Sequence, residues 1–464
     1  MPDHIDRILA TGRVELLVGD VREKHLGLDP GVLNELAESV TLVIHCAANI
    51  SLLASLNDTI RDNCLPTLEL AKLASGFKNL SRFVYVSTAY VNIFLPAGSV
   101  EEKIYETRDA EKQLAEILET GSASASDVED FPTPYTFAKH LTERLLFLRH
   151  PRLALLIFRP TFIGPAISQP FPYYQRDGSV PASTLIEKFM EFGISKQILS
   201  HLHGATNILD EIPVDLAANL LLLHCMHGST GPVHACAQSY IPRTFSQFIA
   251  DDVAPYTRQV NTRTQSSGRA GTRLRFALRF YPMMSSGKDW HFSNAASRKF
   301  ANVGGPLGMK LHDHDPEKFF AYRSKVIAEK VRAKAAAKLG ANGAPSQKER
   351  AKTWARIDDL AYGTLPQVPC APPASPAPGT KPATSIALLG VTNVGDMSHV
   401  FRRYAYPLIK LIDLIGASRK APDGVLFATR ALFGHFDLSV IGLEAKQSSA
   451  IPFKLESVKP KLNL

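Results

Sequence analysis

Short apolar runs alternate with longer helical patterns between Arg13 and Pro160. The apolar runs cover Arg13–Asp20, Val40–Ala48, Arg82–Tyr90 and Arg152–Pro160, and each is apolar enough for a strand that is covered on both faces. The long helical patterns cover Leu56–Ser75 and Tyr135–Leu148, with Pro134 at a first-turn position. Strands that alternate with helices in this way are typical of βαβ units. The sequence therefore predicts an α/β fold with a Rossmann-like parallel sheet.

The rest of the chain divides by composition and hydrophobic pattern into three further parts. We expect the α/β domain to occupy residues 1–255 and a smaller mixed, mostly helical region to follow at 256–360. Residues 361–385 are rich in proline and alanine and predict a linker with extended polyproline character. In the tail, 386–464, the segments YAYPLIKLIDLIGA and DGVLFATRALFGHFD predict two helices, with Gly416 and Gly434 near their ends.

Composition excludes several classes of protein. The five cysteines are scattered without a Cys-x-x-Cys pair, and no histidine cluster has metal spacing, so neither a disulfide framework nor a metal site is expected. The N-terminus lacks the pattern of a secretory signal, and the longest apolar run, Ala217–Met226, is too short to span a membrane. We therefore expect an intracellular protein, either cytoplasmic or associated with an organelle membrane.

The net charge of +8 raises the question of acidic partners. The excess of basic residues is concentrated in one helical stretch, 324–356, without the interleaved aromatic residues of a nucleic-acid site. A solvated basic face explains it, and no nucleic-acid partner is predicted. Peripheral membrane contact through this stretch and the C-terminal apolar segments is a further hypothesis. The sequence gives no prediction of the oligomeric state.

The chemistry is predicted from a small constellation of polar residues. Tyr135 and Lys139 are four residues apart on a predicted helix, so both side chains lie on one face. That helix follows a strand that ends at Thr88, and the next strand runs into the segment Arg159–Gly164. Because carboxyl ends of parallel strands share one rim of a sheet, these residues should converge there. Such convergence is what an active site requires.

Residue type then suggests a role for each side chain. A tyrosine hydroxyl has a pKa near 10 in water, and a lysine ammonium one turn away would lower it, so Lys139 is expected to tune Tyr135. Thr88 offers a hydroxyl donor that, with Tyr135, could hold a carbonyl oxygen as it gains negative charge. We expect Ser87 to make a structural hydrogen bond at the strand end, although a single sequence leaves exchanged roles of Ser87 and Thr88 open.

Several longer segments carry a specific resemblance. The run Val43–Asn92, followed by PYTFAKHLTERLLF, FRPTFIGPAISQPFPYY and ILDEIPVDLAANLLL, resembles the fatty acyl-CoA reductase family, an extended branch of the short-chain dehydrogenases. The similarity covers about Val14 to Gln247 and continues more faintly to Lys325. It implies an NAD(P)-binding reductase domain at 1–255 and NADPH-dependent reduction of a long-chain fatty acyl-CoA to the aldehyde and onward to the fatty alcohol.

The resemblance also implies site residues. In catalysis, Tyr135 would donate a proton or polarise the oxygen, Lys139 would also contact the nicotinamide ribose, and Thr88 would complete the oxyanion contacts. The full cofactor-binding set implied in this way is Asp20, Val21, Cys46, Ala47, Ala48, Tyr135, Lys139, Pro160, Thr161 and Ile163.

Three of the matched positions have plain structural interpretations. Asp20 is equally well explained as a turn or cap residue, and Asp215 is fully explained as a helix N-cap. Cys46 is interpreted as a small buried hydrophobic residue and not as a nucleophile.

The sequence also departs from the family. Family members begin with a strand, a Gly-x-x-Gly-x-x-Gly turn for the cofactor's diphosphate, and a second strand that chooses between NADP and NAD. The early glycines here do not form that fingerprint, so we expect two central strands to be missing, together with the strand that chooses between NADP and NAD. A sheet with such exposed edges should be poorly stable. We expect an incomplete coding sequence or processed fragment, with a degenerate pseudoenzyme and an intact but unusual reductase as alternatives.

Rival functions remain open from the sequence alone. One is another enzyme of the same superfamily, such as a nucleotide-sugar epimerase, a sterol dehydrogenase or the terminal reductase of a multidomain synthetase. The segment Phe171–Tyr174 and the apolar residues after Gly164 favour a lipid or thioester over a sugar. The other is a non-catalytic binding protein or scaffold, which would be separated from the enzymes by a test of NADPH binding.

Overall fold

The structure is a computed structural model that describes residues 14–339 with internal gaps, and the strands Ile386–Val391 and Val425–Arg430 near the C-terminus. The gaps are 52–53, 132, 170–171, 176–179, 193, 196–206, 238–240, 257–258, 261–288 and 310–314. Three predicted segments lie outside the described residues. They are the part of the basic stretch at 340–356, the linker at 361–385 and the segment YAYPLIKLIDLIGA.

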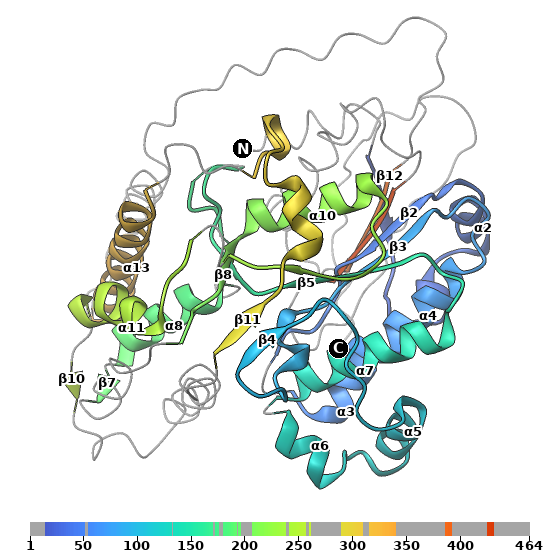
Figure 1. Ribbon diagram of the computed structural model, residues 1–464, viewed down its shortest axis with the longest axis horizontal. Coiled ribbons are helices and arrows are strands. Elements are labelled where there is room, and N and C mark those ends of the chain that lie inside the picture. Colours follow the sequence, from blue (N-terminus) through green and yellow to red (C-terminus); the bar gives the residue numbers. More distant parts are fainter. Residues whose placement is uncertain are drawn as a thin grey trace, which may run out of the picture.

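A seven-stranded parallel sheet forms the centre of the described molecule (Figure 1), as the sequence predicts. Its strands, in spatial order, are β1 (Val14–Val18), β12 (Ile386–Val391), β13 (Val425–Arg430), β2 (Leu42–His45), β3 (Arg82–Val86), β5 (Leu155–Pro160) and β9 (Gly231–Ala235). Each of the four predicted apolar runs contains one of these strands, namely β1, β2, β3 and β5. The first is an edge strand and the other three are internal strands.

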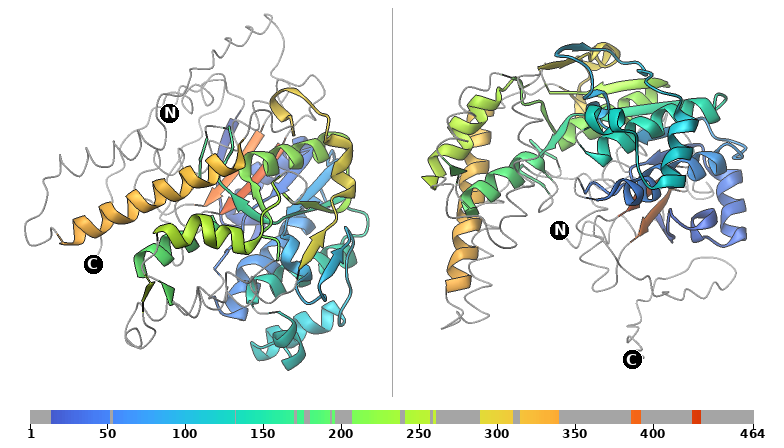
Figure 2. Two further views of the ribbon diagram at one scale, coloured as in Figure 1. Left: turned by 60° about the vertical axis from the view of Figure 1, so that its left-hand side comes forward. Right: turned by 90° about the horizontal axis from the view of Figure 1, so that it is seen from below.

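The positions between β1 and β2 in the sheet are not empty, which corrects the expectation of exposed strand edges. β12 pairs with β1 from Val14↔Ile386 to Val18↔Gly390, and β13 pairs with β2 from Leu42↔Val425 to His45↔Ala428. In Figure 2 these two strands, orange and red, lie among the blue strands of the N-terminal part. β13 also corrects the helix predicted over DGVLFATRALFGHFD, because its first half forms a strand.

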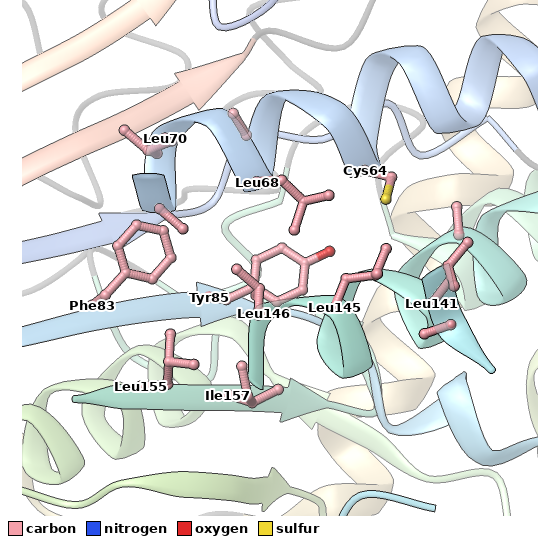
Figure 3. Packing of buried hydrophobic residues seen from close by; sticks show 14 of the residues in the cluster. Cys64, Leu68, Leu70, Phe83, Tyr85, Leu141, Leu145, Leu146, Leu155 and Ile157 are labelled. Carbon is pink, nitrogen blue, oxygen red and sulfur yellow. The ribbon is translucent and has the colours of Figure 1, made fainter. Parts of the chain in front are cut away.

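Alternating side chains of the strands face two different helical layers. Val43, Phe83 and Tyr85 belong to a buried cluster on one face, together with α4 (Leu65–Ala74) and α7 (Pro134–Arg149). Leu42 and Val84, one residue away, belong to a second cluster with α10 (Val214–His227) on the other face. Figure 3 shows the first layer, in which Leu68, Leu145 and Leu146 surround the ring of Tyr85. Because successive side chains of a strand point to opposite faces of the sheet, the residues of each strand contribute to both buried clusters.

Local sequence signals set the ends of the helices. Pro134 occupies the first turn of α7, where Thr133 caps the amide of Thr136, as the position of Pro134 predicts. The predicted helix Leu56–Ser75 forms as one helical segment in three parts, α3 (Leu56–Thr59), the π-helix η2 (Ile60–Cys64) and α4. The remaining helices of this domain are α2 (Pro30–Ser39), α5 (Ala110–Thr120) and α6 (Ala125–Asp130).

A smaller helical lobe packs beside the sheet domain. It contains α8 (Pro181–Phe192), α11 (Phe245–Phe248) and the long α13 (Pro316–Leu339), which share a third apolar cluster. Three two-stranded parallel sheets complete the described fold: β4 (Gly98–Val100) with β11 (Trp290–Phe292), β6 (Phe162–Gly164) with β8 (Glu211–Pro213), and β7 (Ile194–Ser195) with β10 (Gln259–Val260). The domain boundaries stay predictions.

Buried ion pairs attach α13 to the rest of the protein. Arg323 of α13 contacts Glu211 at 2.8 Å and Asp252 at 3.0 Å, and the side chains are at most 5% exposed. Within the described part of the chain, none of the helices has the length and hydropathy needed to cross a membrane.

Candidate active site

The carboxyl ends of β3 and β5 lie side by side and bring Thr88 to the rim of the sheet. The Ser87 amide donates a hydrogen bond to the Phe158 carbonyl at 2.7 Å, which continues the β3–β5 ladder to this point. Thr88 follows with a hydroxyl that lies 3.4 Å from the Pro160 carbonyl oxygen and accepts from the Tyr90 amide at 3.3 Å. The Thr88 side chain is therefore fixed at the end of β3, where the sequence predicts it.

The structural hydrogen bond expected for the Ser87 hydroxyl is not formed. Among the described residues this buried hydroxyl has no hydrogen-bond partner. The backbone amide of Ser87, and not its side chain, makes the contact that closes the strand end. Two hydroxyl groups, Ser87 and Thr88, therefore lie at this point of the rim.

Helix α7 brings Tyr135 and Lys139 to the same rim. The Lys139 ammonium donates to the Val86 carbonyl at 2.8 Å and lies 4.4 Å from the centre of the Tyr85 ring. It lies 6.0 Å from the centre of the Tyr135 ring. Tyr135 is partly exposed, whereas Lys139 is only 2% exposed. Lys139 therefore contacts the end of β3 two residues before Thr88 and lies 6.0 Å from the centre of the Tyr135 ring, whereas the catalytic roles of the three residues stay predictions.

The electrostatics of this pair differ from the expectation. Burial raises the pKa of Tyr135 to about 12, which is the opposite direction to the lowering expected from Lys139. Burial also lowers the pKa of Lys139 to about 8, with Cys46 and Glu143 acting in the opposite sense. A neighbouring ammonium favours the phenolate, but here the cost of burying the two ionisable groups is the larger effect. The hydroxyl of Tyr135 is therefore held in its protonated form.

The lowered pKa of Lys139 predicts a pH-dependent stability effect. A lysine whose folded pKa of about 8 lies below its unfolded value near 10.4 penalises the folded state below pH 8, and the penalty fades as pH rises toward 10.4. Lys139→Met should therefore raise the free energy of unfolding at pH 7 by up to roughly 3 kcal/mol. The gain should shrink by pH 9.5, as measured by urea unfolding at both pH values.

Lys78→Met is the matched control for this prediction. Lys78 pairs with Glu38 on the surface, with a side chain that is 68% exposed, so its replacement should have a small effect that hardly changes between the two pH values. A gain from Lys139→Met that is equal at pH 7 and pH 9.5 would contradict the desolvation argument.

Small residues follow β2 at the neighbouring position of the rim. Ala47 and Ala48 are buried, and burial raises the pKa of the Cys46 thiol to about 12, which fits a small hydrophobic residue and not a nucleophile. The Asn63 side chain accepts from the Asn49 amide at 2.7 Å and donates to the Asn49 carbonyl at 2.8 Å. This amide pair holds the chain after β2 against η2, and no sequence signal indicated the role of Asn63.

Asp20 and Val21 lie just beyond the carboxyl end of β1. The Asp20 carboxylate accepts from the Arg22 amide at 2.9 Å and from the Arg22 guanidinium at 2.7 Å. Its carbonyl accepts from the Glu23 amide, so the turn interpretation of Asp20 describes its contacts. Val21 belongs to the same buried cluster as Ala47. In the sheet, β12 and β13 separate β1 from β2.

The segment after β5 is anchored by a carboxylate that the sequence analysis did not single out. The Thr161 hydroxyl donates to Asp210 Oδ1 at 2.8 Å, and the same oxygen accepts from the Ala237 amide at 2.6 Å. Pro160 ends β5, and Ile163 lies in β6, which pairs with β8. Asp210 thus fixes the predicted cofactor-binding segment Pro160–Ile163. The sequence does carry a signal for this role. Two adjacent acidic residues lie in the otherwise apolar run ILDEIP, and a carboxylate that is buried in such a run needs hydrogen-bond partners.

Asp215 has a different role from the predicted helix N-cap. The N-cap of α10 is Pro213, and the Asp215 carboxylate instead accepts from the amides of Ile167, Ser168 and Gln169 at 2.8–3.1 Å. Three donors from one loop satisfy the buried carboxylate better than the helix amides alone would. Asp215 therefore holds the loop after β6 against α10.

The residues of the rim offer no cluster for a metal ion. Within the described ranges, no group of three or more histidine, cysteine, aspartate or glutamate side chains is arranged to hold one. His45, beside the rim, is buried against Thr67 at 2.9 Å, and burial lowers its pKa to about 3. The polar side chains described at the rim include the hydroxyl groups of Ser87 and Thr88 and the ammonium group of Lys139.

Comparison with known proteins finds a family model and several curated relatives that match part of the chain. The model of the family described as "Male sterility protein", NAD_binding_4, matches residues 2–221. A Drosophila melanogaster protein provisionally named fatty acyl-CoA reductase CG8306 is 34% identical over 208 residues, which cover 43% of this chain and 39% of that protein. Fatty acyl-CoA reductase 1 of Gallus gallus is 27% identical over 256 residues, covering 50% of this chain and 47% of the relative.

The chain thus spans about two-fifths to one half of the length of these relatives. Among solved structures, the reductase domain of a non-ribosomal peptide synthetase from Mycobacterium tuberculosis is similar with a TM-score of 0.45 and 18% sequence identity, covering 70% of this chain and 77% of that one.

Proposed function

We propose that this protein is a nicotinamide-dependent reductase of fatty acyl thioesters, because residues 2–221 match the family model described as "Male sterility protein", NAD_binding_4. The proposed substrate is a long-chain fatty acyl-CoA, which is reduced to the aldehyde with release of the coenzyme A thiol and onward to the alcohol. The single observation that carries the proposal is that the Lys139 ammonium, which lies 6.0 Å from the centre of the Tyr135 ring, donates to the Val86 carbonyl two residues before Thr88, at the end of β3.

The residues at the rim fit a nicotinamide cofactor. The buried Lys139 ammonium has three donors, and among the described residues one of them bonds to the Val86 carbonyl, which leaves two that could donate to ribose hydroxyl groups. The small side chains of Cys46, Ala47 and Ala48 after β2 would let the cofactor approach the backbone closely. Pro160, Thr161 and Ile163 would line the opposite side, and Asp20 and Val21 would contact the adenine end. When bound, the cofactor supplies the hydride, and we propose NADPH.

The protein's own groups account for the remaining chemistry. Tyr135 holds its proton at neutral pH because burial raises its pKa, so it can donate to a carbonyl oxygen that becomes an alkoxide. Thr88 would donate a second hydrogen bond to the same oxygen by turning its one hydroxyl hydrogen away from the Pro160 carbonyl, to which it makes a long contact of 3.4 Å. Lys139 would position the cofactor and place a positive charge near the developing negative charge whenever it is protonated. Two hydrides are consumed for each thioester that is reduced to the alcohol.

A cluster of aromatic side chains between the segment after β6 and α13 supports a lipid substrate over a sugar. Tyr173, from the segment that suggested a lipid in the sequence, packs against Phe319 at 4.8 Å and Tyr322 at 4.4 Å between ring centres. Phe319 and Phe320 form a buried apolar cluster with Ile241. We propose that the acyl chain is bound on this side, between the sheet domain and α13.

Substitutions at Thr88 and Ser87 decide which hydroxyl acts on the substrate. Thr88→Ala should lower kcat by about 10²-fold or more, because it removes one oxyanion donor. Thr88→Ser should restore most of the activity, whereas Ser87→Ala should change kcat by less than about threefold. The measurement is steady-state NADPH oxidation with palmitoyl-CoA. A large loss in Ser87→Ala with little loss in Thr88→Ala would exchange the two roles.

The proposed function is tested by product analysis. The purified chain is incubated with NADPH and palmitoyl-CoA, and oxidised cofactor, free coenzyme A thiol, aldehyde and alcohol are measured together. We expect thiol release coupled to cofactor oxidation, with two NADPH consumed per thiol if the alcohol is formed and one if reaction stops at the aldehyde. Cofactor oxidation with a nucleotide sugar but not with palmitoyl-CoA would contradict the proposed substrate.

A further inference from the structure

The order of the strands in the chain differs from their order in the sheet at one place. β1 and β2 are consecutive along the sequence, joined through α2, yet two strands from the far C-terminal part lie between them. β12 runs parallel to β1 and to β13 in continuous register, and β13 runs parallel to β2. The central ladder of the sheet is therefore built from residues more than three hundred positions apart.

The sequences of the two strands fit a central position. Ile386–Val391 reads IALLGV and Val425–Arg430 reads VLFATR, which are runs like those that predicted β1, β2, β3 and β5. Parallel strands covered on both faces have this composition, whereas an exposed tail does not require it. Without β12 and β13, β1 and β2 would each present an unpaired edge to solvent.

The ends of these strands lie on the rim that carries the candidate site. All seven strands are parallel, so the carboxyl ends of β12 and β13 share the edge at which β2 leads into Cys46 and β3 leads into Thr88. Gly390, near the end of β12, is paired with Val18 on one side and Thr429 on the other. A glycine at such a strand position allows close approach of a ligand to the backbone.

We propose that residues 386–391 and 425–430 complete the cofactor-binding sheet of their own chain, and that cofactor binding depends on them. The second half of this statement rests on the proposed function, and the first half does not. Residues 340–385, which join α13 to β12, have a reach of up to ~3.3 Å per residue, so the segment can return to its own sheet. The alternative occupant is the same segment of a second copy, exchanged between two chains.

Hydrogen exchange on the full-length chain tests whether residues 386–391 and 425–430 are strands of the sheet. Amides of 386–391 and 425–430 should exchange at least about a thousand-fold more slowly than the same sequences in short peptides, similar to those of β2 and β3. Exchange of both segments at the peptide rate, with β2 and β3 protected, would overturn the proposal whatever the activity of the protein.

Engineered cysteine pairs test which strands are neighbours and in which chain. Val43 and Leu426 are register partners, and parallel neighbours lie about 4.8 Å apart, so Val43→Cys with Leu426→Cys should form a disulfide upon oxidation. The matched control, Val43→Cys with Leu388→Cys, should not, because β13 lies between β2 and β12. A disulfide-linked dimer would instead indicate exchange between copies, and cross-linking of the control pair would overturn the strand order.

A proline in β12 tests whether cofactor binding depends on the two C-terminal strands. Leu388→Pro removes a ladder donor from a strand that is paired on both sides and should weaken NADPH binding at least tenfold and release the protection of 386–391. Ser448→Pro, outside both strands, is the control and should leave both unchanged. If the wild-type chain does not bind NADPH but the amides of both strands are protected from exchange, the proposed function alone is refuted. If Leu388→Pro abolishes the protection of 386–391 but leaves NADPH binding unaffected, the proposed dependence of cofactor binding on these strands is refuted.

Discussion

Tyr135→Phe is expected to lower kcat by about 10²- to 10⁴-fold, because it removes the hydroxyl that is proposed to donate a proton to the reduced oxygen. Folding should be largely unaffected, since Tyr135 is partly exposed and the phenyl ring keeps its packing. NADPH binding should change by less than about threefold, because Lys139 and the backbone after β2 are intact. The measurement is NADPH oxidation with palmitoyl-CoA, beside NADPH titration of the same preparation.

Tyr105→Phe provides the control for removing a tyrosine hydroxyl elsewhere. The Tyr105 hydroxyl accepts from the Glu101 amide at 2.9 Å on an exposed segment, so its loss should cost stability slightly and leave turnover nearly unchanged. Wild-type turnover in Tyr135→Phe would refute the proton-donor role, whereas equal losses in both variants would point to a general effect on folding.

Glu143→Gln is expected to lower the free energy of unfolding by about 3 kcal/mol or more. The Glu143 carboxylate pairs with the Arg159 guanidinium between α7 and β5, with Nε–Oε1 at 3.1 Å, and both side chains are only 1% exposed. A neutral amide leaves the buried guanidinium without its counter-charge, and breaking such a pair from one side costs about 3–5 kcal/mol. Chemical denaturation at neutral pH measures the change.

Two variants separate this effect from a simple loss of contacts. Glu143→Leu combined with Arg159→Met removes both charges and should recover most of the stability lost in Glu143→Gln. Glu111→Gln breaks the exposed pair with Arg149, whose side chains are 44% and 37% exposed, and should cost less than about 1 kcal/mol. If Glu143→Gln costs no more than Glu111→Gln, the buried pair does not hold α7 to β5.

The strands and helices that flank the site could be predicted because their signals are local. The apolar runs around β2, β3 and β5 and the Thr133-Pro134 start of α7 are patterns of a few consecutive residues. The central position of β12 and β13 could not be predicted, since nothing local connects residue 386 with residue 14. The helix predicted over 423–437 was wrong at Val425–Arg430 because an apolar run of that length fits a strand or a helix equally well.

The site could be predicted in position but not in its electrostatics. Helical spacing and the shared rim placed Tyr135, Lys139 and Thr88 together. Desolvation, which raises the pKa of Tyr135 and lowers that of Lys139, depends on how deeply the fold buries them. Asp210 and Asp215 were missed as anchors for the same reason: their partners come from distant loops, and only the fold brings them together.

Equilibrium binding of NADPH to the purified full-length chain tests the central claim most directly. A cofactor site on the rim predicts saturable binding with a Kd roughly in the micromolar range, displaced by NADP⁺ and weakened by Leu388→Pro but not by Tyr135→Phe. The absence of saturable binding of either NADPH or NADH by the folded chain would contradict the assignment of this rim as a cofactor-binding site.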